Sequence, residues 1–467
     1  MKDASLTDFS EQAFSEGFLE VFSESFFQSV HDELFNNILP YWEKHSRDTR
    51  PGFEGFFGEI DNSNKPNPDC SRSIVMTSRF LWTYSAVARF TKDPRYLEMA
   101  DFAYNAIITH YLDKQNGGVY WSVTPNGTPE VSKKQVYGEA FCIYGLSEYA
   151  AALKELRNGG GESLPLAAAG KPSFATPSPK GESLKNPAKS LSLAEQAMNL
   201  ATDLYNQLET HAKDSVCGGY IEACARDWSS TTDMILSPKD MNCPKSMNTN
   251  LHVMEAYTNL YRTITVVFPE QKNLQVQIGR SLKELVQVTV KSILQPNNHL
   301  GMFFDMEWKL LADEISYGHD IEASWLLWEA VCELNDEKLK EEIRQTVIDI
   351  AETAYKEGFD SANGCMENYT KNGGKVRNRN RVWWIQAETI NGFYNAWEMT
   401  SLKKYSEVCL KQWKWILEYQ KDSVSGEWWN EVDPDGKPVL IEAKGGNWKT
   451  SYHNGRTCLE LLRRAKK

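Results

Sequence analysis

The sequence has few of the features that define several large protein classes. Its nine cysteines are an odd number without CxxC spacing, which argues against zinc ribbons and disulfide frameworks and favours reduced thiols. Lys and Arg form no block long enough to follow a phosphate backbone, and the formal net charge is −12, so nucleic acid and anionic membranes are poor partners. Apolar runs are too short to cross a bilayer, and the first residues contain no apolar signal core. We therefore expect a cytoplasmic protein with no membrane partner.

Strand-like alternation is also scarce, and helical periodicity dominates the chain. The composition, 41% hydrophobic and 24% charged, is that of a globular protein with a large core. The periodicity predicts twelve helices, near residues 12–45, 72–91, 95–112, 134–156, 192–211, 246–265, 272–294, 317–334, 337–357, 382–399, 402–420 and 450–465.

The connections between these helices alternate between tight turns and longer loops that carry glycine and aromatic residues. Examples of the longer kind are 117–121, 218–222, 301–305, 364–369 and 426–430, which resemble small hairpins. A helix pair with one short and one long connection is a repeat, and six such pairs can close into a ring. The long loops must then share one rim, so the residues near the starts of the even-numbered helices should converge there: Arg79, Tyr137, His252, His319, Gln386 and His453.

Three histidines stand in similar surroundings. In Ser316–Trp325, His319 and Glu322 lie three residues apart at a helix start and so share one face, beside Trp325. His252 has the same His-x-x-Glu-Ala arrangement with Glu255, and His453 precedes a helical run. His252 and His319 are 67 residues apart, and His453 follows after twice that interval. We therefore expect several of the repeat units to place one polar side chain each at the rim.

Simpler interpretations compete with this one. A lone histidine at a helix start is more often structural, most tryptophans belong to the core, and Arg79 could balance charge inside the protein. The two His-x-x-Glu pairs also resemble metal-ligand spacing, although helical-bundle sites normally read Glu-x-x-His. An inverting glycosidase would need two separated carboxylates and would give the histidines no role. A carbohydrate-binding or protein-binding barrel without catalysis is the non-enzymatic alternative.

Residues 156–191 interrupt the repeat, because this stretch is rich in Gly, Pro, Ser and Ala. We expect it to be a surface insertion in a single domain that spans residues 1–467.

Several long motifs make the chain resemble the cellobiose 2-epimerases of the N-acylglucosamine 2-epimerase superfamily. They are 245–262, 316–327, 383–388 and 452–456, with weaker matches at 78–80, 137–141 and 219–223. The resemblance covers roughly residues 20–465. It implies an all-α (α/α)6 barrel that epimerises C2 of the reducing-end glucose in β-1,4-linked disaccharides, without a metal or organic cofactor. Cellobiose is the expected substrate, with lactose and mannobiose as further candidates, and a monomer or weak homodimer is expected.

The same resemblance assigns roles to individual positions. His319 and His453 match the acid/base pair, and His252 matches the histidine of ring opening. Polar residues around the sugar are Arg79, Tyr137, Asn248, Glu255 and Glu322, and the stacking aromatics are Trp384 and Trp448, with Trp383 beside them. N-acylglucosamine 2-epimerases and mannose isomerases share this arrangement of active-site residues and are the nearest alternatives.

The chemistry suits these residue types. The C2 proton is acidic only beside an open-chain aldehyde, and the proton must return to the opposite face of a planar enediol. Two histidines can exchange it near neutral pH. Arg79 is expected to stabilise the enediolate oxygen, Glu322 to orient His319, and Glu255 to orient His252. Glu139, Asn250 and Ile385 differ from the residues usual in the family, and we expect the first two to influence substrate preference.

Overall fold

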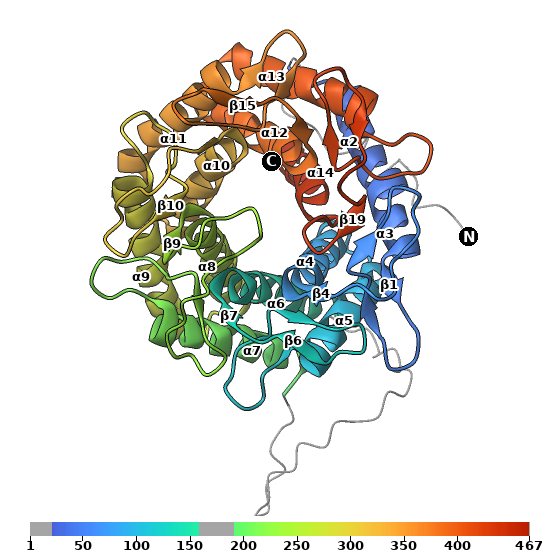
Figure 1. Ribbon diagram of the computed structural model, residues 1–467, viewed down its shortest axis with the longest axis vertical. Helices are drawn as coiled ribbons and strands as arrows, with labels where there is room; N and C mark the ends of the chain where they lie inside the picture. Colours follow the sequence, from blue (N-terminus) through green and yellow to red (C-terminus); the bar gives the residue numbers. More distant parts are fainter. Residues whose placement is uncertain (1–20, 158–190, 467) are drawn as a thin grey trace, which may run out of the picture.

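The computed structural model describes residues 21–157 and 191–466, whose helices form two concentric rings (Figure 1). The inner ring consists of α4 (Ile74–Thr91), α6 (Val136–Leu156), α8 (Met247–Val267), α10 (Tyr317–Leu334), α12 (Trp383–Thr400) and α14 (Tyr452–Ala465). Each inner helix packs against the next, and α14 contacts α4, so the ring is closed. The fold is therefore an (α/α)6 barrel, which confirms the expected all-α class.

The outer ring supplies one helical segment per repeat, and most of these segments end in a short π-helical or 3-10 stretch. They are α2 (Glu24–Asp32) with η2 (Glu33–Ile38) and α3 (Leu39–His45), η3 (Pro94–Tyr96) with α5 (Leu97–Ala106) and η4 (Ile107–Tyr111), α7 (Leu193–Gln207) with η5 (Leu208–Ala212), α9 (Lys272–Val288) with η6 (Thr289–Ile293), α11 (Glu337–Glu357), and α13 (Lys403–Trp415) with η7 (Ile416–Gln420).

The two rings differ in how much of each helix is buried. Every residue from Val136 to Leu153 of α6 is buried, because inner helices are covered on both sides. In contrast, α9 buries only one stripe, which includes Ile278, Leu282 and Leu285. Inner and outer helices can therefore be told apart by the width of their apolar face.

Short strands connect each repeat to the next. The strand that precedes an inner helix pairs with the hairpin of the following repeat, and the last pair joins the final repeat to the first. The pairs are β4 (Arg72–Ser73) with β5 (Ser122–Val123), β7 (Lys134–Gln135) with β8 (Ala223–Cys224), β9 (Lys245–Ser246) with β10 (Phe303–Phe304), β11 (Ile315–Ser316) with β14 (Tyr369–Lys371), β16 (Arg381–Val382) with β17 (Glu431–Val432), and β19 (Gly445–Gly446) with β3 (Glu59–Ile60). Further strands are β1 (Arg47–Asp48), β2 (Gly55–Phe56), β6 (Pro129–Val131), β12 (Phe359–Asp360), β13 (Cys365–Met366), β15 (Val376–Asn378) and β18 (Pro438–Val439).

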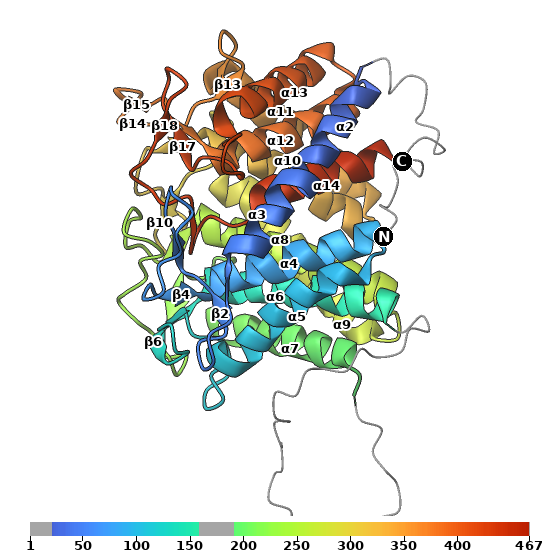
Figure 2. The same ribbon diagram turned by 90° about the vertical axis from the view of Figure 1, so that its right-hand side faces the viewer.

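All of these strands lie on one rim of the barrel, as the side view shows (Figure 2). The expected placement of the hairpins is thus confirmed. The N-termini of the inner helices open onto the same rim, because each inner helix begins directly after one of the paired strands. The rim therefore collects the first turns of six helices.

The expected helix boundaries agree with the structure to within about two residues, except at the N-terminus. The first helix was expected from residue 12; within the described residues the first helix begins at Glu24, where Ser23 is the N-cap and accepts a hydrogen bond from the Phe26 N–H. Residues 12–20 and nearly all of the 156–191 segment lie outside the described residues. Within the described ranges, the helices do not combine the length and apolar character that a bilayer crossing needs.

Candidate active site

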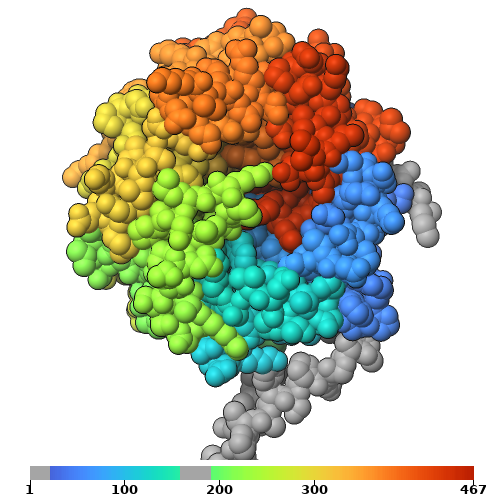
Figure 3. Space-filling model, in the orientation of Figure 1, coloured from blue at the N-terminus to red at the C-terminus, as the bar shows by residue number. Residues whose placement is uncertain are grey.

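The predicted site residues lie at the hairpin rim, in the first turns of the inner helices and the loop before α14. The space-filling view shows a hollow at the centre of this face (Figure 3). Arg79 comes from α4, Tyr137 from α6, and His319 and Glu322 from α10. The others are Asn248, His252 and Glu255 on α8, Trp383 and Trp384 on α12, His453 on α14 and Trp448 just before α14.

Two of the three histidines have a buried carboxylate partner. His252 Nδ1 lies 2.7 Å from Glu255 Oε2, as expected for residues three apart on one helix. His453 Nδ1 lies 2.7 Å from Glu388 Oε1, which belongs to the neighbouring helix α12. Because a carboxylate only accepts, Nδ1 carries the proton in both rings and each Nε2 has a free lone pair.

The third histidine, His319, has a different partner from the one predicted. Its Nδ1 lies 2.8 Å from the hydroxyl oxygen of Ser316, which immediately precedes α10. Glu322 instead accepts a hydrogen bond from Arg456 Nη2 at 2.8 Å and lies 4.0 Å from His453 Nδ1. The expectation that Glu322 orients His319 was wrong, because Ser316 is the nearer partner and Glu322 faces the α14 side of the barrel.

Arg456 connects the histidine–carboxylate pairs. Its guanidinium bonds to Glu255, and its Nη2 lies 2.8 Å from Glu322 and 2.7 Å from Glu388. All four side chains are almost completely buried. A single cation therefore links the partner of His252 to the partner of His453.

Burial and these charges set the protonation states. Burial raises the pKa of Glu388, but Arg456 and His453 outweigh it and lower the value to about 2, and Glu255 has a pKa of about 2 for similar reasons. Burial and the Glu388 carboxylate raise the pKa of Glu322 well above its usual range, so this carboxyl is neutral.

The histidines are neutral as well. Burial lowers the pKa of His319 and of His453 to about 3, and it also lowers the pKa of His252. With Glu322 neutral, the two ionised carboxylates balance Arg79 and Arg456, so the site carries no net charge. Three neutral imidazoles are available as bases.

The α4–α6 side of the hollow presents a cation and an aromatic surface. Arg79 donates to the Trp448 carbonyl at 2.6 Å and to the Tyr137 hydroxyl at 3.0 Å. The Trp448 ring lies 5.8 Å from the Tyr137 ring and 5.9 Å from that of Trp121. Asn248 Oδ1 is buried and has no partner among the described residues, so it is free to accept a hydroxyl donor.

On the opposite side, Trp384 lies beside both members of the predicted acid/base pair. Its ring is 4.7 Å from the His319 ring and 5.7 Å from the His453 ring, and it is partly exposed. Trp383 is only 6% exposed and faces Lys449, with its ring 6.3 Å from His453. Trp384 can therefore stack on a sugar ring, whereas Trp383 is buried and packs near His453.

The 67-residue interval between histidines is not a structural register. His252 is the sixth residue of α8, His319 the third of α10 and His453 the second of α14. Gln386, expected at the rim on this interval, is fully buried and bonds to the Met366 backbone. The histidines converge because all inner helices start at one rim, not because they occupy equivalent positions.

Glu139 and Asn250, expected to influence substrate preference, are likewise fully buried. Glu139 accepts from the Val119 N–H, and Asn250 accepts from the Tyr220 N–H. Both side chains hold hairpins rather than facing the hollow.

Sequence reasoning missed Glu388 and Arg456 as site residues. Each lies inside a motif that was singled out, Glu388 in 383–388 and Arg456 in 452–456. A His-x-x-Arg spacing on one helix face could have identified Arg456, but the partner of Glu388 lies 65 residues away. No local spacing reveals that pair.

Glu322, Glu388 and His453 also have the donor atoms of a metal site, within 4.8 Å of one another. However, the Arg456 guanidinium bonds to both carboxylates and so takes the position where a cation would bind. The donor set is therefore a poor fit to a metal ion.

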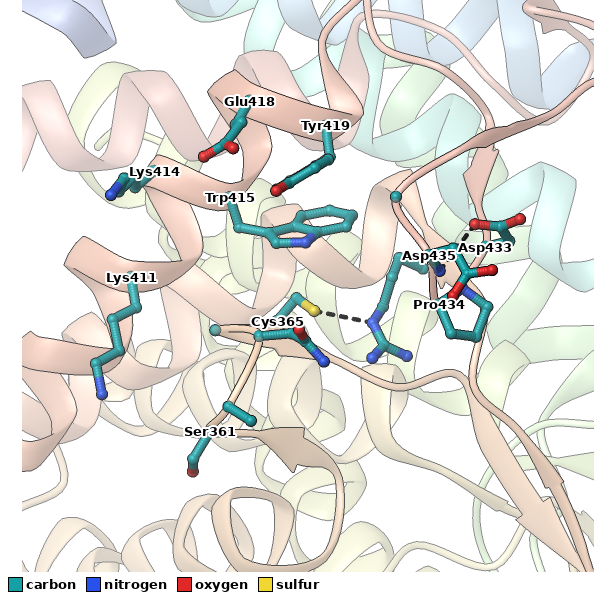
Figure 4. A pocket seen from close by; sticks show the side chains of 15 residues that line it. Ser361, Cys365, Lys411, Lys414, Trp415, Glu418, Tyr419, Asp433, Pro434 and Asp435 are labelled. Atoms are coloured by element: carbon teal, nitrogen blue, oxygen red, sulfur yellow. Dashed lines mark hydrogen bonds between the residues drawn. The ribbon is translucent and has the colours of Figure 1, made fainter.

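A separate pocket of about 460 Å³ lies at the outer edge of the rim (Figure 4). Its lining, drawn from the described residues, includes Trp415, Tyr419 and Asp435 but no histidine. Among its three basic lining residues, Arg381 donates to Cys365 Sγ and to Asp360. This pocket is therefore not the catalytic centre.

Comparisons with known proteins agree with this fold. The family model for N-acylglucosamine 2-epimerase (GlcNAc 2-epimerase) matches residues 55–162 and 187–456. The cellobiose 2-epimerase of Bacteroides fragilis is 36% identical over 436 residues, which cover 93% of this chain and 98% of that protein. The solved structure of cellobiose 2-epimerase from Bacillus thermoamylovorans has a TM-score of 0.79 at 31% identity, with coverage of 94% of this chain and 99% of that one. The Spirochaeta thermophila cellobiose 2-epimerase also has a TM-score of 0.79, at 32% identity and with coverage of 96% and 98%. The chain belongs to the N-acylglucosamine 2-epimerase family.

Proposed function

We propose that this protein epimerises C2 of the reducing-end glucose of cellobiose and related β-1,4-linked disaccharides. The observation that carries the proposal is the set of three neutral histidines, His252 and His453 buried and His319 partly buried, around a hollow with a cation on one side and an aromatic surface on each side. The three relatives named above are cellobiose 2-epimerases, and each is at least 31% identical across almost the whole chain.

The reaction begins with ring opening. His252 Nε2 accepts the proton of the anomeric hydroxyl, the C1–O5 bond breaks, and the His252 imidazolium then returns this proton to O5. Glu255 stabilises the imidazolium that forms. The product is an open-chain aldehyde whose C2 proton is acidic.

Proton transfer at C2 then uses the two histidines beside Trp384. One imidazole removes the C2 proton, the C2–H electron pair forms the C1–C2 double bond, and the carbonyl electrons move to O1 to give an enediolate. The other imidazole, which has taken up a proton from solvent, gives it to C2 on the opposite face as the carbonyl re-forms. Ring closure gives the mannose configuration, and the first imidazolium releases its proton to solvent. Glu388 holds the Nδ1 proton of His453, so that Nε2 is the resting base.

The enediolate oxygen is stabilised by Arg79 and by the position of the site. Arg79 is fixed by Tyr137 and the Trp448 carbonyl, so its remaining N–H groups need little reorganisation. The inner helices also point their N-terminal, partially positive ends at the same rim. Both effects favour negative charge in the hollow.

The carboxylates are poorly placed for the glycosidase alternative. Glu255, Glu322 and Glu388 all bond to Arg456, so none is free to act as an acid or base at a glycosidic bond. The stacking faces of Trp384 and Trp448 lie on separate helical repeats, which favours a substrate with two sugar rings over a monosaccharide.

The direct test is proton NMR of cellobiose with chelator-treated protein in D2O. Deuterium at C2 together with 4-O-glucosyl-mannose signals is the expected result. Methyl β-cellobioside is the matched control, because its blocked anomeric carbon prevents ring opening and it should bind without exchange. If cellobiose shows no exchange, parallel reactions with N-acetylglucosamine and mannose decide between the related activities, and binding without any exchange would indicate a sugar-binding barrel.

A further inference from the structure

One polar side chain in the first turn of several inner helices holds the adjacent hairpin. It is the fourth residue of the helix in each case: Glu139 in α6, Asn250 in α8, Asp320 in α10 and Gln386 in α12. Each accepts a hydrogen bond from a backbone N–H of the hairpin, at 2.8–3.1 Å. The four residues therefore occupy equivalent structural positions.

The two amides use both of their polar atoms. Asn250 Nδ2 donates to the carbonyls of Tyr220 and Ser246 at 3.0 and 2.9 Å. Gln386 Nε2 donates to those of Met366 and Val382 at 3.0 and 3.3 Å. The second atom at this position thus faces carbonyl oxygens and must be a donor.

At Asp320, a second residue supplies the donor that a carboxylate lacks. Its Oδ1 accepts from the Leu300 N–H, and its Oδ2 lies 2.7 Å from His299 Nδ1. An ionised carboxylate is thus acceptable in α10 because the imidazole supplies the second donor.

Among the described residues, Glu139 has no neighbour that supplies this second donor. Its Oε1 accepts from the Val119 N–H at 2.8 Å, whereas its Oε2 is buried without a partner among the described residues. The surroundings otherwise match those of Asn250. A Cβ on Gly118 would lie 2.7 Å from Glu139 Oε1 and 2.6 Å from Trp228, and one on Gly219 would lie 2.8 Å from Asn250 Oδ1 and 2.5 Å from Trp308. Because the two positions are equivalent, Glu139 Oε2 corresponds to the Nδ2 donor of Asn250. The carbonyls that correspond to those of Tyr220 and Ser246 are here the carbonyls of Val119 and Gln135.

We propose that Glu139 is a positioning residue that works as a neutral carboxylic acid, and that its ionisation loosens the hairpin carrying Trp121. Only the protonated carboxyl can both accept from the Val119 N–H and donate from the other oxygen, as an amide does. This inference rests on the proposed function, because Trp121 packs against Trp448, which the proposed function uses as a stacking surface for the sugar.

The charged and titratable groups around Glu139 are consistent with a neutral carboxyl. Lys134 attracts its charge, but Lys134 Nζ is already bonded to Asp113 at 3.1 Å, and Asp113 also binds Arg226. The thiols of Cys142 and Cys224 are uncharged, since burial raises their pKa. Burial likewise raises the pKa of Glu139 to about 7, which Lys134 and the Val119 N–H reduce only in part.

The hairpin is connected to the substrate face by two contacts. The Trp121 carbonyl accepts from the Ile74 N–H at the start of α4, the helix that carries Arg79. The Trp121 ring lies against Trp448, whose carbonyl holds Arg79. A carboxylate at 139 would repel the carbonyl oxygens, shift this hairpin and weaken substrate binding.

The test is the pH dependence of kcat/KM for Glu139→Gln against the unaltered protein. Between about pH 6 and pH 8 the neutral fraction of a carboxyl with a pKa of about 7 falls about tenfold, so the ratio of variant to unaltered kcat/KM should rise by up to that factor. The cause of this change should be a KM of the unaltered protein that increases with pH, while its kcat stays nearly constant. Parallel profiles for the two proteins would overturn the proposal, and so would loss of activity at all pH values in a folded variant, because it would show that the carboxylate itself is needed.

The reciprocal variant is Asn250→Asp, which places an acid without a companion in the equivalent position of α8. It should acquire a decline of kcat/KM at alkaline pH that the unaltered protein lacks, and an unchanged profile would count against the mechanism. Infrared spectra in D2O give a readout independent of activity. A protonated-carboxyl band that disappears on raising the pH should be present in the unaltered protein and missing from Glu139→Gln. Its presence without any sugar turnover would separate failure of the proposed function from failure of this inference.

Discussion

Glu388→Gln is the substitution that most directly tests the coupling of the histidines to their carboxylates. The side chain keeps its shape, and its oxygen can still accept from His453 Nδ1 and from Arg456 Nη2, both now at 2.7 Å. The negative charge is removed, and so is the oxygen that accepts from Trp325. The Trp325 indole N–H, 3.0 Å from Glu388 Oε2, then faces an amide group.

The magnitude follows from the charge-assisted hydrogen bond to His453. Such a bond contributes about 1.5–3 kcal/mol, compared with about 1 kcal/mol for a neutral one. The imidazolium that forms after proton abstraction loses the difference, about 0.5–2 kcal/mol, so kcat should fall by about 2- to 30-fold. KM should change by less than about threefold, because Glu388 is fully buried and does not face the sugar.

The assay is the initial rate of C2 deuterium exchange into cellobiose, with substrate affinity measured by calorimetry on the same protein. Glu222→Gln is the matched control: Glu222 is also buried and contacts an inner-helix start, but it bonds to Ser246 and Thr249 rather than to a histidine. A kcat for Glu388→Gln close to that of the unaltered protein, or an equal loss in the control, would refute the assignment of His453 as an acid/base group oriented by Glu388.

Four further outcomes are expected. His319→Asn should bind cellobiose with near-normal affinity in calorimetry yet abolish C2 exchange, and retained exchange would remove His319 from the mechanism. Arg79→Lys should lower kcat/KM by about 100-fold in the same assay, because an ammonium cannot bond to Tyr137 and Trp448 and still reach the enediolate; a loss below about threefold would contradict this role. Arg456→Met should reduce the free energy of unfolding in urea by about 3–5 kcal/mol, because it leaves buried carboxylates without their cation; an unchanged urea midpoint would show that the cluster is relaxed or protonated. Burial raises the pKa of Glu222 from 4.5 to about 7, so the folded state holds this proton more tightly, and about 3 kcal/mol of stability that is present below pH 4.5 should be lost as the pH rises to about 7; urea titrations at several pH values should show a smaller decline in Glu222→Gln.

Much of the fold could be predicted from the sequence because it depends on local rules. Helix starts follow from capping residues such as Ser246, whose hydroxyl accepts from the Thr249 N–H. The alternation of short turns with glycine-rich hairpins predicts that all long loops share one rim, and the strand pairs confirm it. The pair His252–Glu255 was predicted correctly for the same reason, since both residues lie on one helix face.

Relations between different helices were decided only by the tertiary structure. The sequence placed His319 beside Glu322, but the rotation of α10 in the ring turns Glu322 toward Arg456 and leaves Ser316 as the partner of His319. The pairing of His453 with Glu388 depends on how close α12 and α14 lie and on which faces they present to each other. Which helices form, and which residues stand near their starts, could be predicted because both depend on contacts within a few residues of the chain. The closed ring decided which carboxylate serves which histidine, because ring radius and helix rotation arise from packing across the whole barrel.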